Sequence, residues 1–401
     1  MNNEQPDPAL STVALHDADA ERRHGEPLST PIVNSVNFYA DPEGVGYSAL
    51  DLEEGAPPFY GRWGNPTAGA LERRLAALER GSGAIVFASG MAAIAAVFFQ
   101  ELSSGDHLIL SDLCYPGVAE LALDLSERYG VGLTAVDTAD PAAVAAAMTP
   151  RTRLVHIETP ANPIWRLADI AAIAEIAHRG GALLSVDSTV ATPVATRPLS
   201  LGADYVVHSL TKYATGHGDV LAGAVIAGER SLFGMRKRCL SHLGAALSPQ
   251  AASQVLRSLE TLPLRMAAHQ ANAARVAAFL EAHPAVARVW WPGLTSHPQH
   301  GLARAQMGNF SGMISFTTAD AHRMARQIKD RVRLVSYAVS LGKTKSLIFF
   351  IDTEALLASA YRWSEAQAAR FRAETGTGVF RLSVGLEDAD DIIADLAAAL
   401  A

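Results

Sequence analysis

The chain has 401 residues, 49% of them hydrophobic and 18% charged, and this balance excludes an intrinsically disordered protein. Its formal net charge of -8 excludes the extended basic face that nucleic-acid binding requires. The length exceeds that of one ordinary domain, so we expect a large α/β domain and at least one smaller domain.

The same inventory argues against a leader, a membrane span and a metal site. The first thirty residues are polar and acidic, and the longest apolar stretch, 91–99, is far shorter than a bilayer span. Cys114 and Cys239 are too few for a disulfide framework or a zinc site, and His208 and His217 lack an acidic or cysteine companion at a ligand spacing. We predict a cytoplasmic protein that binds no metal, no nucleic acid and no membrane.

The chain begins with a segment of low periodicity. Residues 1–62 contain proline, glycine and acidic residues without a sustained hydrophobic period, so we predict an extended arm that packs on a partner subunit.

The stretch that follows alternates between the hydrophobic periods of helices and of strands. We predict helices over 68–79 and from about 91, and strands at 84–88, 107–110, 132–136, 154–158, 183–187, 205–208 and 221–227. Continuous apolar runs of this kind are typical of buried parallel strands. Residues 63–257 are therefore predicted to form an α/β domain with a large, mostly parallel sheet, whose working residues lie just past the carboxyl ends of the strands.

The remaining chain predicts a smaller α+β domain over residues 258–401. A long helix is expected over 248–282, interrupted at Pro263, followed by strands at 312–316 and 380–384. The stretch 354–374, rich in Ala and Arg, is expected to be one helix.

The strongest chemical signal is Lys212, which follows the strand 205–208 in the stretch HSLTKYATGHGD. A lysine amine whose pKa is lowered by burial or by neighbouring charges can form a Schiff base with a carbonyl cofactor. Taken alone, however, a lysine in a loop is more often a solvated surface residue than a catalytic one.

Two further segments favour a cofactor. Asp187 ends the strand 183–187, where a buried carboxylate needs a cationic partner such as a protonated pyridine nitrogen. Ser89 and Gly90 lie at a strand-to-helix turn, where free amides and the helix dipole favour a phosphate, and Ser209 and Thr211 add hydroxyl donors. Together with Lys212, these segments predict a site for pyridoxal 5′-phosphate (PLP).

Eight stretches make the sequence similar to the Cys/Met-metabolism family of PLP enzymes, which includes cystathionine γ-synthase, cystathionine γ-lyase and methionine γ-lyase. They cover nearly the whole chain and read FYGRWGNPT, ASGMAA, DLCYPG, ETPANP, VDSTVATP, HSLTKYATGHGD, SLGKTKSLI and RLSVGLED. The resemblance implies the aspartate-aminotransferase-like fold (fold type I) and a homotetramer made of two catalytic dimers.

Position by position, the resemblance implies a role for each candidate site residue. Lys212 is expected to be the Schiff-base lysine and Asp187 the partner of the pyridine nitrogen. Tyr115 is expected to stack on the cofactor ring and to act as an acid or base at the leaving group, although a packed aromatic is the alternative.

The phosphate is expected to bind Ser89, Gly90, Met91, Ser209 and Thr211, with Tyr60 and Arg62 reaching it from the neighbouring subunit. Asn162 is expected near the cofactor oxygen, and with Ser340 and Arg381 it is expected to bind the substrate, Arg381 holding the α-carboxylate of an amino acid.

Departures from the family pattern bear on the substrate. Lys345 replaces a glutamate associated with some cystathionine-processing members, which disfavours cystathionine. The expected Met-Thr-His motif is absent. The stretch 354–374 is either a surface helix or a lid over the substrate, in which Tyr361, Trp363 or a glutamate contacts an unusual substrate side chain.

We predict a lyase that eliminates the γ-substituent of an L-amino acid such as methionine or canavanine. The alternative is a γ-replacement synthase, either an O-acetyl- or O-succinylhomoserine sulfhydrylase or a cystathionine γ-synthase.

Overall fold

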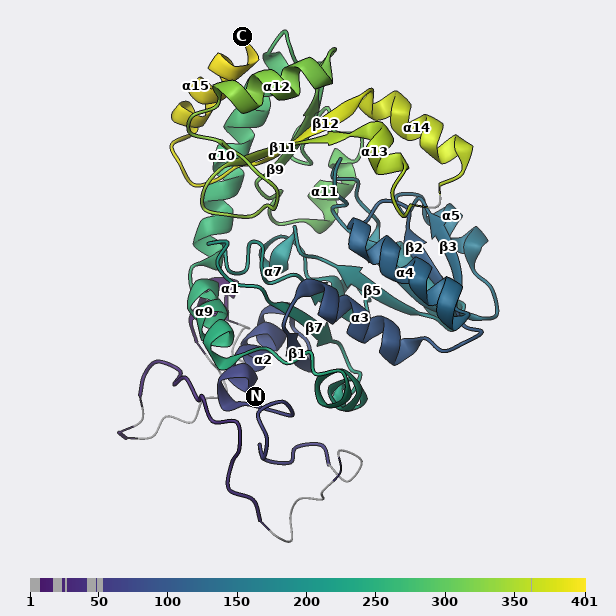
Figure 1. Cartoon of the computed structure of the whole chain (residues 1–401), viewed down its shortest axis with the longest axis vertical. Helices are drawn as coiled ribbons and strands as arrows, with labels where there is room; N and C mark the ends of the chain where they lie inside the picture. Colours follow the sequence, from purple (N-terminus) through teal and green to yellow (C-terminus); the bar gives the residue numbers. More distant parts are fainter. Residues whose placement is uncertain (1–7, 17–23, 26, 42–47, 49–52, 362) are drawn as a thin grey trace, which may run out of the picture.

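A computed structural model describes residues 8–16, 24–25, 27–41, 48, 53–361 and 363–401. Two β-sheets lie one above the other, and the long helix α10 (Leu262–Ala282) runs along one side of the molecule from the lower sheet to the upper one (Figure 1).

The lower sheet has seven strands in the order β1-β7-β6-β5-β4-β2-β3. Strand β7 runs antiparallel to both of its neighbours, whereas the pairs from β6 through β3 are parallel, which confirms the predicted mostly parallel sheet. Each strand lies within about two residues of the predicted range: β1 Gly83–Phe87, β2 His107–Ser111, β3 Gly132–Val136, β4 Thr152–Glu158, β5 Leu183–Asp187, β6 Tyr205–His208 and β7 Gly223–Ala227.

Helices connect these strands and cover the sheet. Several begin with proline in the first turn, where its missing N–H costs nothing, and several are capped by Asn, Ser or Asp. They are α2 Pro66–Glu79, α3 Gly90–Glu101, α4 Pro116–Tyr129, α5 Pro141–Ala147, α6 Ile170–Arg179, α7 Thr192–Ala195, α8 Phe233–Met235 and α9 Pro249–Leu259, with a 3-10 turn at Pro198–Leu201 and a π-helical turn at Arg236–His242.

The predicted arm is not extended throughout. Residues Leu10–Leu15 form the short helix α1, which packs on α2, and the guanidinium of Arg74 donates to the carbonyl of Ala14. The stretches 1–7, 17–23, 42–47 and 49–52 of the predicted arm, with residue 26, lie outside the described residues.

The upper sheet has five strands in the order β10-β11-β12-β9-β8. Its elements are β8 Arg288–Trp290, β9 Met313–Thr317, β10 Ser336–Tyr337, β11 Leu347–Asp352 and β12 Gly378–Ser383, with α11 His300–Gln306, α12 Ala321–Arg331, α13 Thr353–Leu357, α14 Glu365–Thr375 and α15 Ala389–Leu400.

Two predicted helices are wrong in detail. The expected helix over 248–282 is divided into α9 and α10 at residues 260–261, and Pro263 lies in the first turn of α10, where proline is tolerated. The expected helix over 354–374 is two helices, α13 and α14, because Ser364 caps α14 with its side chain and a new helix starts there.

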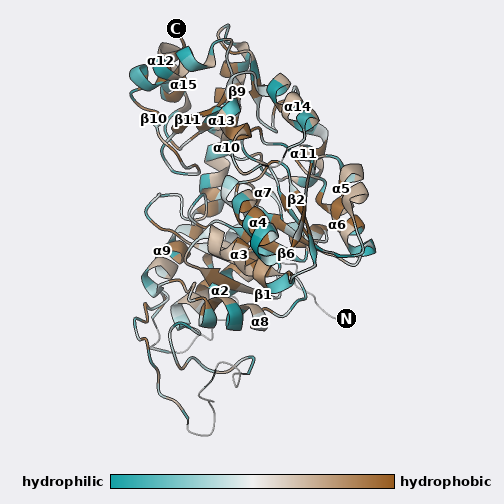
Figure 2. Cartoon of the chain, turned by 45° about the vertical axis from the view of Figure 1, so that its right-hand side comes forward, coloured by the Kyte–Doolittle hydropathy of each residue, from teal (hydrophilic) through white to brown (hydrophobic). Residues whose placement is uncertain are grey.

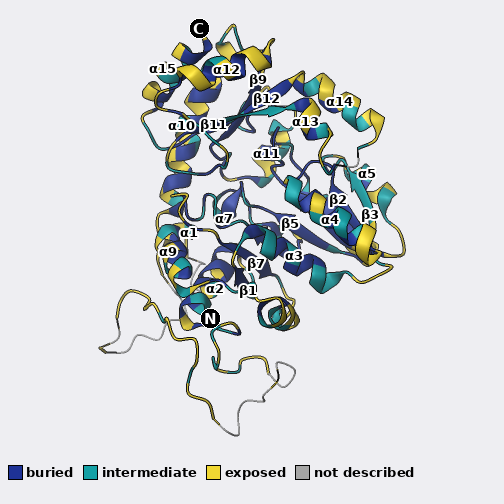
Figure 3. Cartoon of the chain, viewed as in Figure 1, coloured by how far each residue is buried: buried dark blue, intermediate teal, exposed yellow. Residues whose placement is uncertain are grey.

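The buried residues concentrate in the strands and the helix faces that cover them (Figure 3). The largest hydrophobic cluster, here called the first core, lies mainly at the lower sheet, and another, here called the second core, lies at the upper sheet. Hydropathy follows the same division, with the strands mostly hydrophobic (Figure 2). Leu356, Tyr361 and Phe371 come from the C-terminal part of the chain but belong to the first core. The predicted domain boundaries, between residues 62 and 63 and between residues 257 and 258, stay predictions.

None of the helices in the described part of the chain combines the length and the apolar character needed to cross a bilayer.

Candidate active site

The turn between β1 and α3 meets the start of the loop after β6. The hydroxyl of Ser89 caps α3 by accepting from the amide of Ala92 at 3.1 Å, and the amides of Gly90 and Met91 have no acceptor inside the helix. A Cβ added to Gly90 would lie 2.7 Å from Cβ and 2.9 Å from Oγ of Ser209, so only glycine permits this approach. Free amides and a hydroxyl therefore converge on one small cradle suited to a phosphate.

Thr211 lies close to the cradle but its hydroxyl is already engaged. It donates to the carbonyl of Ala222 at 3.2 Å and accepts from the amide of the same residue at 3.1 Å. A phosphate bound by Thr211 would take over the first of these bonds.

Asp187 ends strand β5, and Lys212 follows the neighbouring strand β6. Asp187 is buried and accepts from the amide of Thr189 at 3.0 Å, and burial raises the pKa of its carboxyl group. Partial burial, with the nearby positive charge of Arg381, lowers the pKa of the Lys212 amine, and Asp187 opposes this shift. The amine donates to the hydroxyl of Ser340 at 3.1 Å.

Residues of the upper sheet complete this side of the site. Arg381, on β12, donates to Oδ1 of Asn162 and to the carbonyl of Ser340, each at 3.1 Å, and desolvation lowers the pKa of its guanidinium to about 10. Ser340 has a φ of 80°, a left-handed conformation that non-glycine residues adopt at a cost. A planar cation whose charge acts on the Lys212 amine is suited to binding a carboxylate beside it.

Tyr115 precedes α4 and remains 53% exposed. A Cβ added to Gly117 would lie 2.9 Å from Cε1 of Tyr115 and 3.2 Å from Sδ of Met91, so the phenol ring lies over the first turn of α4, on the side of the phosphate cradle. The structure thus brings an accessible phenol to the site.

Sequence reasoning missed Glu158, which lies beside Asp187 in the register of β4 and β5. Its two carboxylate oxygens accept from the amides of Tyr115 at 2.6 Å and Asn162 at 2.9 Å. Burial, and then the charge of Asp187, raises the pKa of Glu158 to about 8. A polar residue at the end of a buried strand was the available signal.

Sequence reasoning also missed a buried pair at the end of β6. His208 Nε2 lies 2.6 Å from Oε1 of Glu79, and both side chains are buried. The sequence allowed His208 to be weighed only as a metal ligand, because its partner is 129 residues away.

Tyr60 and Arg62 make their contacts elsewhere in this single chain. Arg62 donates to the carbonyl of Ser241 and lies 5.4 Å above the ring of Tyr60, which is 41% exposed. Their predicted role at a neighbouring subunit's cofactor stays a prediction.

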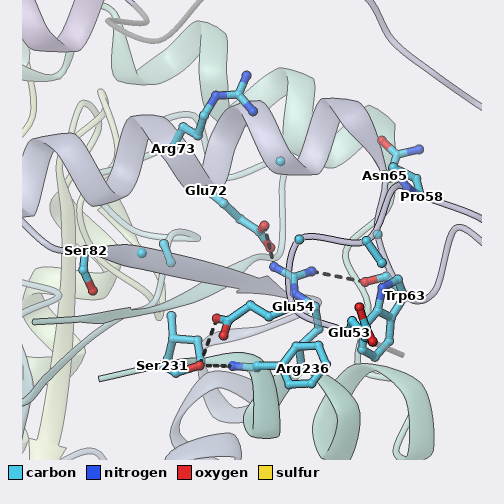
Figure 4. A pocket seen from close by; sticks show the side chains of 18 of the residues that line it. Glu53, Glu54, Pro58, Trp63, Asn65, Glu72, Arg73, Ser82, Ser231 and Arg236 are labelled. Atoms are coloured by element: carbon cyan, nitrogen blue, oxygen red, sulfur yellow. Dashed lines mark hydrogen bonds and ion pairs between the residues drawn. The ribbon is translucent and has the colours of Figure 1, made fainter. Parts of the chain in front are cut away.

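A separate hollow of about 650 Å³ lies between α2, the start of β1 and residues 53–58 of the arm (Figure 4). Arg236 crosses it to Glu72 at 2.6 Å. No predicted site residue lines this hollow.

The site residues fit PLP in three respects. The glycine-floored cradle at Gly90 suits a phosphate, the amine of Lys212 suits an aldehyde, and the buried carboxylate of Asp187 calls for a cation such as a pyridinium.

Comparisons with known proteins agree with this fit. The family model described as Cys/Met metabolism PLP-dependent enzyme matches residues 11–401. An L-methionine γ-lyase of Fusobacterium nucleatum subsp. polymorphum is 40% identical over 389 residues, 96% of each chain. A canavanine γ-lyase of Pseudomonas canavaninivorans is 40% identical over 397 residues, 98% of this chain and 96% of the relative.

Among solved structures, a cystathionine γ-lyase from Lactobacillus plantarum complexed with L-serine superposes with a TM-score of 0.85 at 35% identity, covering 98% of both chains. The fold is therefore the PLP fold type I that the sequence predicts. The chain belongs to the Cys/Met-metabolism family of PLP-dependent enzymes.

Proposed function

We propose that this protein is a γ-lyase that eliminates the γ-substituent of an L-amino acid, with methionine and canavanine as the candidate substrates. The observation that carries the proposal is the convergence of the Lys212 amine, the Asp187 carboxylate and the Arg381 guanidinium beside the accessible phenol of Tyr115. The identity of 40% with relatives named for both substrates supports it.

The first sheet would hold the cofactor. The amides of Gly90 and Met91 and the hydroxyls of Ser89, Ser209 and Thr211 would bind the phosphate, and Asp187 would pair with the ring nitrogen. When bound, PLP supplies an electron sink for the electrons released at Cα.

Lys212 would transfer the protons near Cα. Its lowered pKa increases the neutral fraction of the amine near neutral pH, and only the neutral amine can accept a proton. Arg381 would orient the substrate by its α-carboxylate, with Ser340 and Asn162 already bonded to the same guanidinium.

Tyr115 would act at the other end of the substrate. Its phenol is exposed to the site, so it can give a proton to the group that leaves Cγ. Elimination from methionine then consumes one water and yields a 2-oxo acid, ammonia and a thiol.

The active assembly would contain at least two chains. Tyr60 and Arg62 are exposed in the single chain, which supports the proposal that they would reach the phosphate cradle of a second copy. We propose the homotetramer of two catalytic dimers, in the cytoplasm, as its working form.

The test is to incubate the purified holoenzyme with methionine, canavanine, cystathionine, or O-acetylhomoserine plus sulfide. We expect ammonia and a 2-oxo acid from methionine, or release of the γ-substituent from canavanine with its amino-acid product identified. Lys212→Ala is expected to lose both the activity and the visible absorbance of the bound cofactor. Formation of homocysteine from the ester, with no elimination from any substrate, would make the protein a replacement synthase instead.

A further inference from the structure

Two aromatic residues between α13 and α14 contact the segment that carries Tyr115. Tyr361 and Trp363, here called the aromatic clamp, stack with ring centroids 5.3 Å apart and ring planes 24° from parallel. Trp363 also packs edge-on against Phe371 of α14, at 5.0 Å. Tyr361 is only 7% exposed, and Trp363 is partly buried and packs against the same hydrophobic cluster.

The clamp binds main-chain atoms of residues 112–114, which connect β2 to Tyr115. The hydroxyl of Tyr361 donates to the carbonyl of Cys114, and the indole N–H of Trp363 donates to the carbonyl of Asp112 at 2.7 Å. Both bonds end on the backbone immediately before Tyr115. The clamp therefore restrains the path of the chain into the catalytic tyrosine.

Polar and charged side chains of α14 bind residues on and near the same segment. Gln367 donates to Oδ2 of Asp112 at 3.3 Å, while Arg166 lies 3.3 Å from the other carboxylate oxygen of Asp112 and 3.0 Å from Asp137. Arg370 of α14 also pairs with Asp137. Figure 1 shows α14 on the side of the upper sheet that faces β2, β3 and α4.

The other side of the segment is held by the site itself, because the amide of Tyr115 donates to Glu158 at 2.6 Å. The backbone of residues 112–115 is thus bound from inside by Glu158 and from outside by the aromatic clamp. The hydroxyl of Tyr361 is committed to Cys114, which does not match the alternative of a lid whose tyrosine contacts the substrate.

We propose that Tyr361 and Trp363 are positioning residues that hold the phenol of Tyr115 at the substrate's γ-substituent. This inference rests on the proposed role of Tyr115 as the acid at the leaving group. Misplacement of a reacting group by about 1 Å can cost on the order of 10²-fold in rate, so a backbone restraint next to the acid has a measurable effect.

The experiment uses Tyr361→Phe and Trp363→Phe in the holoenzyme. Tyr361→Phe removes only the hydroxyl donor, whereas Trp363→Phe keeps one aromatic ring but removes the indole N–H together with part of the ring system. We expect kcat to fall by about tenfold in each variant, within the range that geometric misplacement produces, with KM little changed. Trp291→Phe is the matched control: its indole N–H also donates to a backbone carbonyl, that of Ser311 at 3.1 Å, but in the second core. Its kcat should stay at the wild-type value.

A double-mutant cycle separates positioning of Tyr115 from a general loss of stability. In a Tyr115→Phe background, Tyr361→Phe should change the residual rate little, because the group that the clamp positions is gone. Hydrogen exchange should also show faster exchange of the Tyr115 amide in Tyr361→Phe and Trp363→Phe but not in Trp291→Phe.

The outcomes distinguish the two proposals. If Tyr115→Phe retains full kcat, the proposed role of Tyr115 is wrong and the clamp inference falls with it. If Tyr115→Phe is impaired but both clamp variants keep wild-type kcat, only the clamp inference is overturned. An equal loss in both backgrounds, or in Trp291→Phe, would overturn it as well.

Discussion

The amine of Lys212 lies near the positive guanidinium of Arg381 and the buried carboxylate of Asp187, and it donates to Ser340. Partial burial and Arg381 favour the neutral amine, and Asp187 favours the charged one. The balance places the pKa of the amine below the ordinary 10.5, so the free base that attacks an aldehyde is more abundant near neutral pH.

This shift predicts how Lys212 reacts in the cofactor-free protein. An amine-modifying reagent should label Lys212 with a rate that rises with pH and has its midpoint below 10.5, because only the deprotonated amine reacts. Peptide mapping by mass spectrometry gives the rate at this residue, and the denatured protein gives the reference. Equal midpoints in the folded and denatured protein would contradict the prediction.

Single residues differ in how far their position could be predicted. Lys212, Asp187 and Gly90 carry a chemical or steric requirement that the sequence shows directly, at the end of a strand or the start of a helix. Glu158 ends strand β4 as Asp187 ends β5, but its partner Tyr115 is 43 residues away and the bond goes to an amide that every residue possesses, so the sequence did not show what this carboxylate binds. Such pairings come into existence only when the sheet is assembled.

At the scale of elements, the buried strands of the lower sheet were predictable because both of their faces are covered, which makes them continuous apolar runs. Strand β11 escaped prediction. The last four residues of its sequence LIFFID are only partly buried, and the final one is polar. The run therefore shows neither the continuous apolar pattern of a buried strand nor the alternation of a half-buried one. The break between α13 and α14 has a local signal in the capping box of Ser364 and Gln367, whereas the packing of Tyr361 with Trp363 in the connection is a tertiary contact.

Helix α10 is tied to the chain that follows Lys212. Arg265 donates to the carbonyls of Tyr213 at 2.6 Å and Ala214 at 3.1 Å, and to Ser258 at 2.8 Å. Gly216 leaves room for this guanidinium, because a Cβ there would lie 2.4 Å from Nη1 of Arg265.

Replacing this buried guanidinium should destabilise the protein. Arg265→Met leaves several carbonyls without their donor, so we expect the free energy of unfolding to fall by about 2–4 kcal/mol. Arg275→Met on the same helix is the control, since Arg275 pairs with Asp390 at the surface and should cost less than about 1 kcal/mol. Urea unfolding measures both, and similar losses in the two variants would refute the special role of Arg265.

At the scale of the whole molecule, the described chain presents Tyr60 and Arg62 on an exposed arm, away from contact with its own cradle residues. The length, the charge and the alternation of periods predicted two sheets and an arm. The partner that the arm would meet is a second chain, and intrachain packing carries no record of it.

A mixing experiment tests whether two chains share one site. Lys212→Ala lacks the amine and Arg62→Ala lacks the guanidinium, so each homo-oligomer should be nearly inactive. Refolding the two together should restore part of the activity, because hybrid dimers contain one site with both native residues. Size-exclusion chromatography checks that hybrids form, and hybrids without activity would show that Arg62 serves its own chain.

The aromatic clamp also bears on which properties of such an enzyme can change independently. The residues proposed to hold the phosphate and the ring belong to the lower sheet, whereas the residues of the proposed clamp come from the short connection between α13 and α14. If the clamp acts as proposed, substitutions in that connection change the rate of elimination without removing any group that binds the cofactor, so the speed of the enzyme and its hold on the cofactor can be altered separately.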